Sequence, residues 1–331
     1  MRRPLTQQPN SDNPWSRVHP GNRGQKLLHN RRSVLWSGRN EWNACRFHGG
    51  SPAAMLNSPL PATVPVDEAA RVTEQAAVAP GFFRLRFHAP HIARHAVPGQ
   101  FVQVRVTDDL EPFLRRQFSI GDADPSCGLI EIVYHVVGKG SRRLSERKAG
   151  ETIPLLGPLG NGFRLPGCGT VVLVGGGVGM PPVYFAAKSI RGCHVCVIQG
   201  ARCAERLLYR EELSSLGIPH RETTEDGSAG SQGLVTAALI ETLSDFPPDE
   251  RKGPVEILAC GPPPMLAAVA EIARAHGVRC QVSVEERMAC GFGICMGCAV
   301  QKRTAGSKEY ALVCVDGPVF DATEIALAPS S

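Results

Sequence analysis

Four cysteines near the carboxyl end place the tightest constraint on how this chain folds. Cys290, Cys295 and Cys298 lie in the stretch ACGFGICMGC, and Cys314 follows in ALVCVDGPVF, which gives the spacing C-x4-C-x2-C-x15-C. A [2Fe-2S] cluster is held by four thiolates, and this spacing is typical of plant-type ferredoxins. The glycines between the cysteines leave room for backbone N–H groups to turn toward sulfur atoms. We therefore predict that these four cysteines bind a [2Fe-2S] cluster.

A structural zinc site is the main alternative for the same cysteines. Zinc ribbons usually pair two short C-x2-C knuckles, and here only one half of such a pair is present. A set of buried free thiols is a second alternative. The spacing favours the cluster but leaves both alternatives open.

The basic charge of the chain is concentrated at its amino terminus. The chain has 331 residues and a formal net charge of +5. Residues 1–60 hold nine Lys and Arg against only Asp12 and Glu41, so the remainder has 27 basic and 29 acidic residues. Nucleic-acid binding by the folded part therefore has no support. We interpret residues 1–62 as a disordered extension, with translation starting at Met55 or a transit peptide as explanations.

The cysteine content and the apolar runs indicate a cytoplasmic protein. The chain has twelve cysteines but no secretory signal, which favours reduced thiols over disulfides. No uninterrupted apolar run reaches the ~18 residues of a membrane-spanning helix, so we expect no integral membrane association.

Three folded regions follow the extension, and together they predict a multidomain β plus α/β protein. Short alternating segments separated by Gly, Pro and Asp predict a small β-barrel over residues 63–166. Strands alternating with helices predict a Rossmann-like α/β domain with a parallel sheet over residues 167–281. Residues 282–325 form the small carboxyl-terminal cysteine module.

A glycine-rich turn predicts where the α/β domain binds a dinucleotide. The stretch VVLVGGGVGMPP places glycines between a strand and a helix, where backbone can approach a pyrophosphate at the helix N-terminus. These glycines are Gly175, Gly176, Gly177 and Gly179. The choice between NAD and NADP stays open, because no acidic residue ends the strand CVIQG and Arg202 and Arg206 follow it.

The stretch RRQFSI on a predicted barrel strand suits an anionic ligand with a flat ring. Arg116 and Phe118 share one face of this strand, and Ser119 lies next to them. A solvent-facing arginine and a core phenylalanine are the alternative for this segment alone.

The order R-x-F-S, glycine-rich turn and CGPPPM resembles the ferredoxin-NADP reductase superfamily. With VEERMACGFGICMGCAV included, residues 65–325 resemble the electron-transfer subunit of the class B dihydroorotate dehydrogenase. The resemblance implies an FAD-binding barrel, an NAD-binding domain and a [2Fe-2S] module. It also implies that Cys260 lies near the nicotinamide, although a buried strand end would equally explain a cysteine there. The residues that would hold FAD are Arg116, Gln117, Phe118, Ser119, Val133, Tyr134, His135, Gly140 and Ser141.

The same resemblance implies a function in pyrimidine biosynthesis. This chain would transfer electrons, so none of its residues would need to act as a general acid or base. Electrons would pass between NAD(P), FAD, the [2Fe-2S] cluster and an FMN in a separate catalytic subunit that oxidises dihydroorotate to orotate. Two copies of each subunit would form the complex, and the cluster loop would dock on the partner.

Two other functions stay open. A reductase subunit of a hydrogenase, sulfur reductase or transhydrogenase would keep the same cofactors, although some such relatives replace one cluster cysteine by aspartate. A non-catalytic zinc-binding interaction protein would use the cysteines structurally.

Overall fold

The computed structural model describes residues 64–245, 253–303 and 309–327. The predicted basic extension, residues 1–62, lies outside the described residues. Within these ranges no helix combines the length and the apolar character that a membrane crossing requires.

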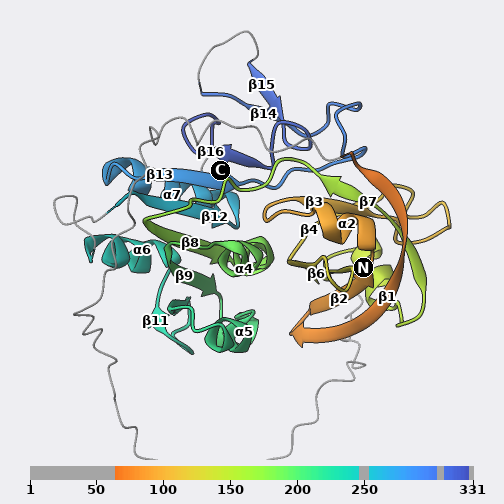
Figure 1. Ribbon diagram of the computed structural model, residues 1–331, viewed down its shortest axis with the longest axis horizontal. Coiled ribbons are helices and arrows are strands. Elements are labelled where there is room, and N and C mark those ends of the chain that lie inside the picture. Colours follow the sequence, from red (N-terminus) through yellow and green to blue (C-terminus); the bar gives the residue numbers. More distant parts are fainter. Residues whose placement is uncertain (1–63, 246–252, 304–308, 328–331) are drawn as a thin grey trace, which may run out of the picture. The chain divides into compact units, whose positions relative to one another are not determined.

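The amino-terminal part of the described chain forms a barrel-like antiparallel sheet (Figure 1). Its seven described strands are ordered β4-β3-β7-β1-β2-β6-β5. Apolar side chains from β3, β6 and the neighbouring strands form one buried cluster inside it, which confirms the predicted β-barrel. The elements are β1 (Val66–Ala79), β2 (Phe82–His88), α2 (Pro90–His95), β3 (Phe101–Val104), β4 (Arg116–Ser119), β5 (Asp122–Asp124), β6 (Leu129–His135), α3 (Lys139–Ser145) and β7 (Thr152–Leu159).

The second sheet is parallel, and it confirms the predicted α/β architecture. Its described strands are ordered β11-β10-β9-β8-β12-β13-β16, and every neighbouring pair is parallel except β13 with β16. The strands are β8 (Thr170–Gly176), β9 (His194–Ala201), β10 (His220–Thr224), β11 (Ser231–Gln232), β12 (Val255–Cys260), β13 (Arg279–Ser283) and β16 (Val319–Asp321).

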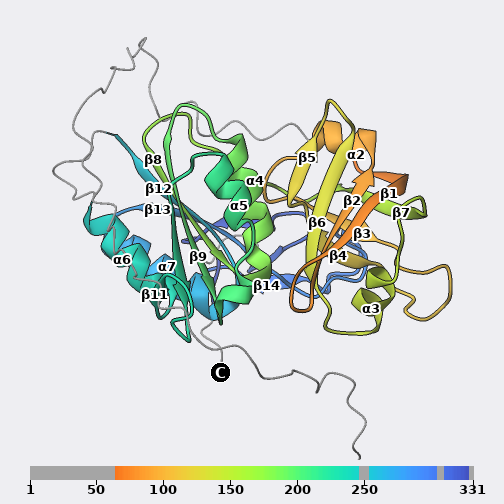
Figure 2. The same ribbon diagram turned by 90° about the horizontal axis from the view of Figure 1, so that it is seen from below.

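Helices cover both faces of this sheet. Figure 2 shows α4 (Met180–Ser189) and α5 (Arg210–Ser215) on the face opposite α6 (Val235–Ser244) and α7 (Pro263–Ala275). The chain runs from β8 outward to β9 and β10 and then returns to β12 on the other side of β8. In such sheets ligands bind beyond the carboxyl ends of the strands at the point where the order reverses. The glycine-rich turn after β8 lies at that point.

The cysteine module is tied to the parallel sheet by its last strand. Strands β14 (Ala299–Gln301) and β15 (Tyr310–Leu312) form an antiparallel hairpin. Strand β16, which lies within the region predicted as the cluster module, pairs with β13 of the α/β sheet. The module therefore has a hydrogen-bonded attachment to the parallel sheet.

Two polar contacts, one of them buried, join the barrel sheet to the α/β part of the chain. The Tyr209 hydroxyl donates to Glu131 Oε1 over 2.8 Å, and both residues are buried. Lys188 Nζ on α4 lies 2.6 Å from Asp122 Oδ2 on β5. Burial, followed by the nearby Glu131 carboxylate, raises the pKa of Tyr209 well above its usual range. The hydroxyl therefore keeps its proton and acts as the donor.

Candidate functional site

The four predicted cluster cysteines lie together and form two pairs. The sulfur atoms of Cys298 and Cys314 are 3.2 Å apart, and both residues are buried. The hairpin explains this pair, because Val313 N–H donates to the Cys298 carbonyl and places residue 314 beside residue 298. In the second pair, Cys295 N–H donates to the Cys290 sulfur over 3.4 Å.

The backbone around Cys290 turns its N–H groups toward sulfur. Burial raises the pKa of the Cys290 thiol, but the N–H groups of Cys295, Phe292 and Ile294 lower it more, to about 6. Burial and the neighbouring Cys298 raise the pKa of Cys314 to about 12. The donors around Cys290 are of the kind that a sulfur-rich, negatively charged centre needs.

This arrangement suits a two-iron centre better than a single ion. A [2Fe-2S] cluster takes two thiolates on each iron, which matches two pairs. A structural zinc ion needs four ligands around one point.

The first cavity, of about 340 Å³, lies between β4, β6 and the chain that follows β13. Six of the predicted flavin-binding residues line it, and they come from two adjacent segments of the barrel: Gln117, Phe118, Ser119, Val133, Tyr134 and His135. The Phe118 and Tyr134 rings lie 5.3 Å apart. The Tyr134 hydroxyl accepts from Gln75, and burial raises its pKa to about 12.

The other three predicted flavin-binding residues lie just outside this lining. A Cβ added to Gly140 would meet Arg116 Nε at 2.7 Å, so the guanidinium rests directly on the start of α3. Ser141 Oγ accepts from the N–H groups of Val137 and Gly138 and so fixes this turn. Arg116, Gly140 and Ser141 thus form one group at the start of β4, where a charged phosphate has access to backbone and guanidinium donors.

The second cavity, of about 560 Å³, lies at the carboxyl ends of the parallel strands. Gly176 and Gly177 line it, together with Gly200 and the first turn of α6. Arg202, Arg206 and Glu225 also line it, so two cations and one carboxylate face the same space. The cavity has the place and the backbone lining of a dinucleotide site.

Three residues predicted near the dinucleotide serve packing in this structure. A Cβ on Gly175 would lie 2.5 Å from Met180 Sδ, and one on Gly179 would lie 2.2 Å from the Cys260 carbonyl oxygen. Cys260 is fully buried and lines neither cavity. Burial, with Glu285 nearby, raises the pKa of its thiol far above the usual range. Its contact with a nicotinamide stays a prediction.

His135 and Val178 line both cavities and mark the place where they meet. The His135 ring stacks on Phe82, its cross-strand partner, with 4.6 Å between ring centres and 14° between planes. Burial lowers the pKa of His135, and Arg206 and Arg202 lower it further. A neutral, stacked imidazole therefore stands between the two spaces at neutral pH.

Several residues that the motifs did not indicate also line the first cavity. Phe101 enters from β3, Ser283 from the end of β13, and Glu285 and Met288 from the segment after β13. The protein around Glu285 desolvates its carboxyl group and raises its pKa. Glu285 and Met288 lie in the stretch VEERMACGFGICMGCAV, which contributed to the family resemblance without giving these two residues a role.

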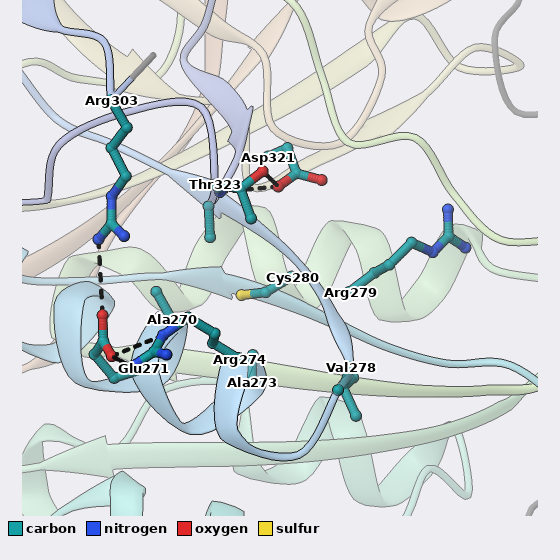
Figure 3. A pocket seen from close by; sticks show the side chains of 12 residues that line it. Ala270, Glu271, Ala273, Arg274, Val278, Arg279, Cys280, Arg303, Asp321 and Thr323 are labelled. Atoms are coloured by element: carbon teal, nitrogen blue, oxygen red, sulfur yellow. Dashed lines mark hydrogen bonds and ion pairs between the residues drawn. The ribbon is translucent and has the colours of Figure 1, made fainter.

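A third cavity, of about 260 Å³, lies apart from all the predicted residues (Figure 3). Arg274 and Arg303 border it, but both face Glu271 at 2.5 and 3.8 Å. Burial raises the pKa of Cys280 to about 12, so its thiol stays protonated. These groups offer no evident redox or binding chemistry.

Comparison with known proteins agrees with this geometry. Residues 285–326 match the family model described as the iron-sulfur cluster binding domain of dihydroorotate dehydrogenase B. Residues 173–271 match the oxidoreductase NAD-binding domain.

Curated relatives match along most of their length. An electron transfer subunit of dihydroorotate dehydrogenase B (NAD(+)) from Lysinibacillus sphaericus is 36% identical over 266 residues, covering 78% of this chain and 98% of the relative. Its counterpart from Bacillus caldolyticus is 38% identical, covering 77% and 97%.

Among solved structures, one of an NADH-dependent reduced ferredoxin-NADP oxidoreductase aligns with a TM-score of 0.69 and 33% identity, covering 78% of this chain and 90% of that chain. A ferredoxin NADP+ reductase from Neisseria gonorrhoeae, at 17% identity and a TM-score of 0.52, shares the fold.

Proposed function

The chain belongs to the family of electron-transfer subunits of dihydroorotate dehydrogenase B, and from this premise we propose that it carries electrons from dihydroorotate oxidation to NAD+. Its cofactors are FAD, a [2Fe-2S] cluster and NAD(P). The partner is an FMN-containing catalytic subunit, on which dihydroorotate becomes orotate.

The continuity of the three sites is the observation that carries this proposal. The dinucleotide cavity meets the flavin cavity at His135 and Val178. The flavin cavity in turn reaches the cluster module, because Gln117 Nε2 donates to the Glu286 carbonyl over 3.1 Å. A flavin exchanges electrons in pairs with nicotinamide and singly with an iron–sulfur centre, so it belongs between them.

We assign the residues of this chain to binding and positioning. Gln117, Phe118, Ser119 and the segment Val133–His135 would hold the flavin ring, and Arg116 would neutralise its pyrophosphate. Gly176 and Gly177 would let the dinucleotide approach the backbone. Cys290 and Cys295 would hold one iron and Cys298 and Cys314 the other, following the two observed pairs.

We assign docking of the partner subunit to the loop of residues 289–298, which holds Cys290, Cys295 and Cys298. Phe292, Ile294 and Met296 are 48%, 76% and 60% exposed, and Val315 lies beside the loop with 46% exposed. Apolar side chains around a redox centre suit a stable docking contact that excludes water. We expect two copies of each subunit in the complex. Because no disulfide joins the described cysteines, we also expect the complex in the cytoplasm.

Reconstitution with the catalytic subunit tests this function. We expect the chain, co-expressed with the dihydroorotate-oxidising flavoprotein of the same cell, to co-purify with it and to support NAD+ reduction by dihydroorotate. The Cys295→Ser variant should keep FAD yet lose the coupled reaction. Failure of the two proteins to associate, with dihydroorotate oxidation independent of this chain, would contradict the proposal.

A second candidate function is that of a reductase subunit that exchanges electrons between a ferredoxin and NAD(P). It rests on the 33% identity to the NADH-dependent reduced ferredoxin-NADP oxidoreductase. Arg202 and Arg206 in the dinucleotide cavity would suit a 2′-phosphate, whereas Glu225 would suit a ribose hydroxyl. The name of that solved structure contains both NADH and NADP, so the electron acceptor, and not the nucleotide, separates the two candidates. Transfer of electrons between NADH and a ferredoxin, with no association with a dihydroorotate-oxidising flavoprotein, would favour this second candidate.

A further inference from the structure

Gln103 on β3 is a fully buried amide with no hydrogen-bond partner. Its side chain is 0% exposed, and neither Nε2 nor Oε1 has a partner within the described residues. Leaving buried polar atoms unpaired is costly, so such a residue needs an explanation. Gln100, three residues earlier on the chain, shows the usual situation: its Oε1 accepts from Val97 N–H and its Nε2 donates to the Gly160 carbonyl.

The amide of Gln103 faces the cluster loop. Residues two apart on a strand share a face, so Gln103 lies on the same side of β3 as Phe101, which packs in one cluster with Cys298 and Cys314. A Cβ added to Gly291 would lie 2.6 Å from Gln103 Nε2. The nitrogen end of the amide therefore lies directly against the backbone of the residue that follows Cys290.

The residues opposite Gln103 on the neighbouring strands do not hydrogen-bond to its side-chain amide. Gln117 stands opposite Gln103 across the β3–β4 pair, but its Nε2 donates to the Glu286 carbonyl and not to Gln103 Oε1. On the other side, Gln103 pairs with Leu156 of β7, whose side chain is apolar. The Nε2 donor thus lies against the loop that holds the cluster and makes no hydrogen bond to any described residue.

We propose that Gln103 Nε2 donates a hydrogen bond to a sulfur of the [2Fe-2S] cluster on the Cys290 side and so raises the cluster's reduction potential. This inference rests on the proposed function, since it requires the cluster. Reduction adds negative charge to the sulfurs, and a donor stabilises that state more than the oxidised one. Gly291 completes the contact, because any side chain there would displace the amide.

The test is the midpoint potential of the cluster in the full chain, measured by an EPR-monitored redox titration. Gln103→Met keeps the length of the side chain and removes the donor, and Gln103→Glu replaces the donor by an acceptor. The control is Gln199→Met, because Gln199 on β9 is also buried, at 2% exposed, with an unpartnered Nε2, but lies three strands away from β13.

We expect Gln103→Met to lower the equilibrium constant for cluster reduction about tenfold, a fall of about 59 mV for one electron. Gln103→Glu should lower it at least as much, and Gln199→Met should leave it unchanged. The chelator-treated Gln103→Met protein should melt no lower than the wild type, since it loses no hydrogen bond. If Gln103→Met fails to fold, the Gln103→Glu potential decides the question.

The outcomes separate the two proposals. Unchanged potentials and g-values in both Gln103 variants, with a normal cluster in the wild type, would overturn the role of Gln103 and leave the function intact. A wild-type protein that never acquires iron and sulfide would overturn the proposed function together with this inference.

Discussion

Replacing Gly291 by alanine should empty the cluster site while sparing the flavin site. Gly291 has φ +81°, where an L-residue costs about 1–2 kcal/mol. The new methyl group would also lie 2.6 Å from Gln103 Nε2, and overpacking of this kind costs about 1–3 kcal/mol. Together these amount to about 2–5 kcal/mol, which corresponds to about 30-fold to several thousandfold weaker retention of the cluster.

Gly297→Ala is the matched control, because the same substitution in the same loop meets only Cys295 Sγ at 3.6 Å. A loop can open locally without unfolding the rest, so the cost should appear as cluster loss. The assay follows visible absorbance and released iron during a challenge with an excess of chelator. We expect rapid loss from Gly291→Ala, retention by Gly297→Ala, and normal FAD content in both. Equal retention in the two variants would refute the reasoning.

Three further predictions concern the cluster, the contact between the sheets and the cavity junction. Cys295→Ser should abolish the [2Fe-2S] spectrum but leave flavin reduction by NADH intact, as stopped-flow absorbance would show; a normal cluster spectrum would contradict the ligand assignment. Tyr209→Phe should lower the free energy of unfolding by about 1.5–3 kcal/mol, because it removes a buried donor to the Glu131 carboxylate. Tyr184→Phe, whose hydroxyl has no hydrogen bond within the described residues, should cost much less in the same urea titration. Because the folded-state pKa of His135 lies below its unfolded value of about 6.5, the unfolded chain takes up this proton first. Stability should therefore fall as pH drops below about 6.5 and through the folded pKa, and His135→Phe should show a smaller fall between pH 7 and pH 5.

Local sequence patterns predicted the features of the fold and the site that depend on residues close together in the chain. The cysteine spacing predicted that four thiols would serve one centre, and the structure places these cysteines in two pairs. The alternation of strands and helices predicted a parallel sheet, because the period of apolar residues follows secondary structure directly. Of the R-x-F-S segment, Gln117, Phe118 and Ser119 line the first cavity, whereas Arg116 lies just outside it.

The parts that the sequence did not reveal depend on long-range pairing. Strand β16 joins the parallel sheet through partners nearly forty residues away, and three residues carry no period that predicts an edge strand. A glycine can be required because a ligand approaches the backbone or because another backbone segment packs against it. The sequence does not distinguish these two cases. Only the structure separates Gly177, which lines a cavity, from Gly179, which packs against Cys260. Gln103 lies in a stretch with no motif at all.

Anaerobic reduction of the isolated chain tests the central claim most directly. The chain, loaded with FAD, iron and sulfide, would be mixed with NADH and followed by absorbance and EPR together. We predict that the flavin band bleaches and that a signal of a reduced [2Fe-2S] cluster appears in wild type, whereas Cys295→Ser bleaches without the signal. A protein that binds no iron, or one whose flavin and cluster both stay oxidised in excess NADH, would contradict the account.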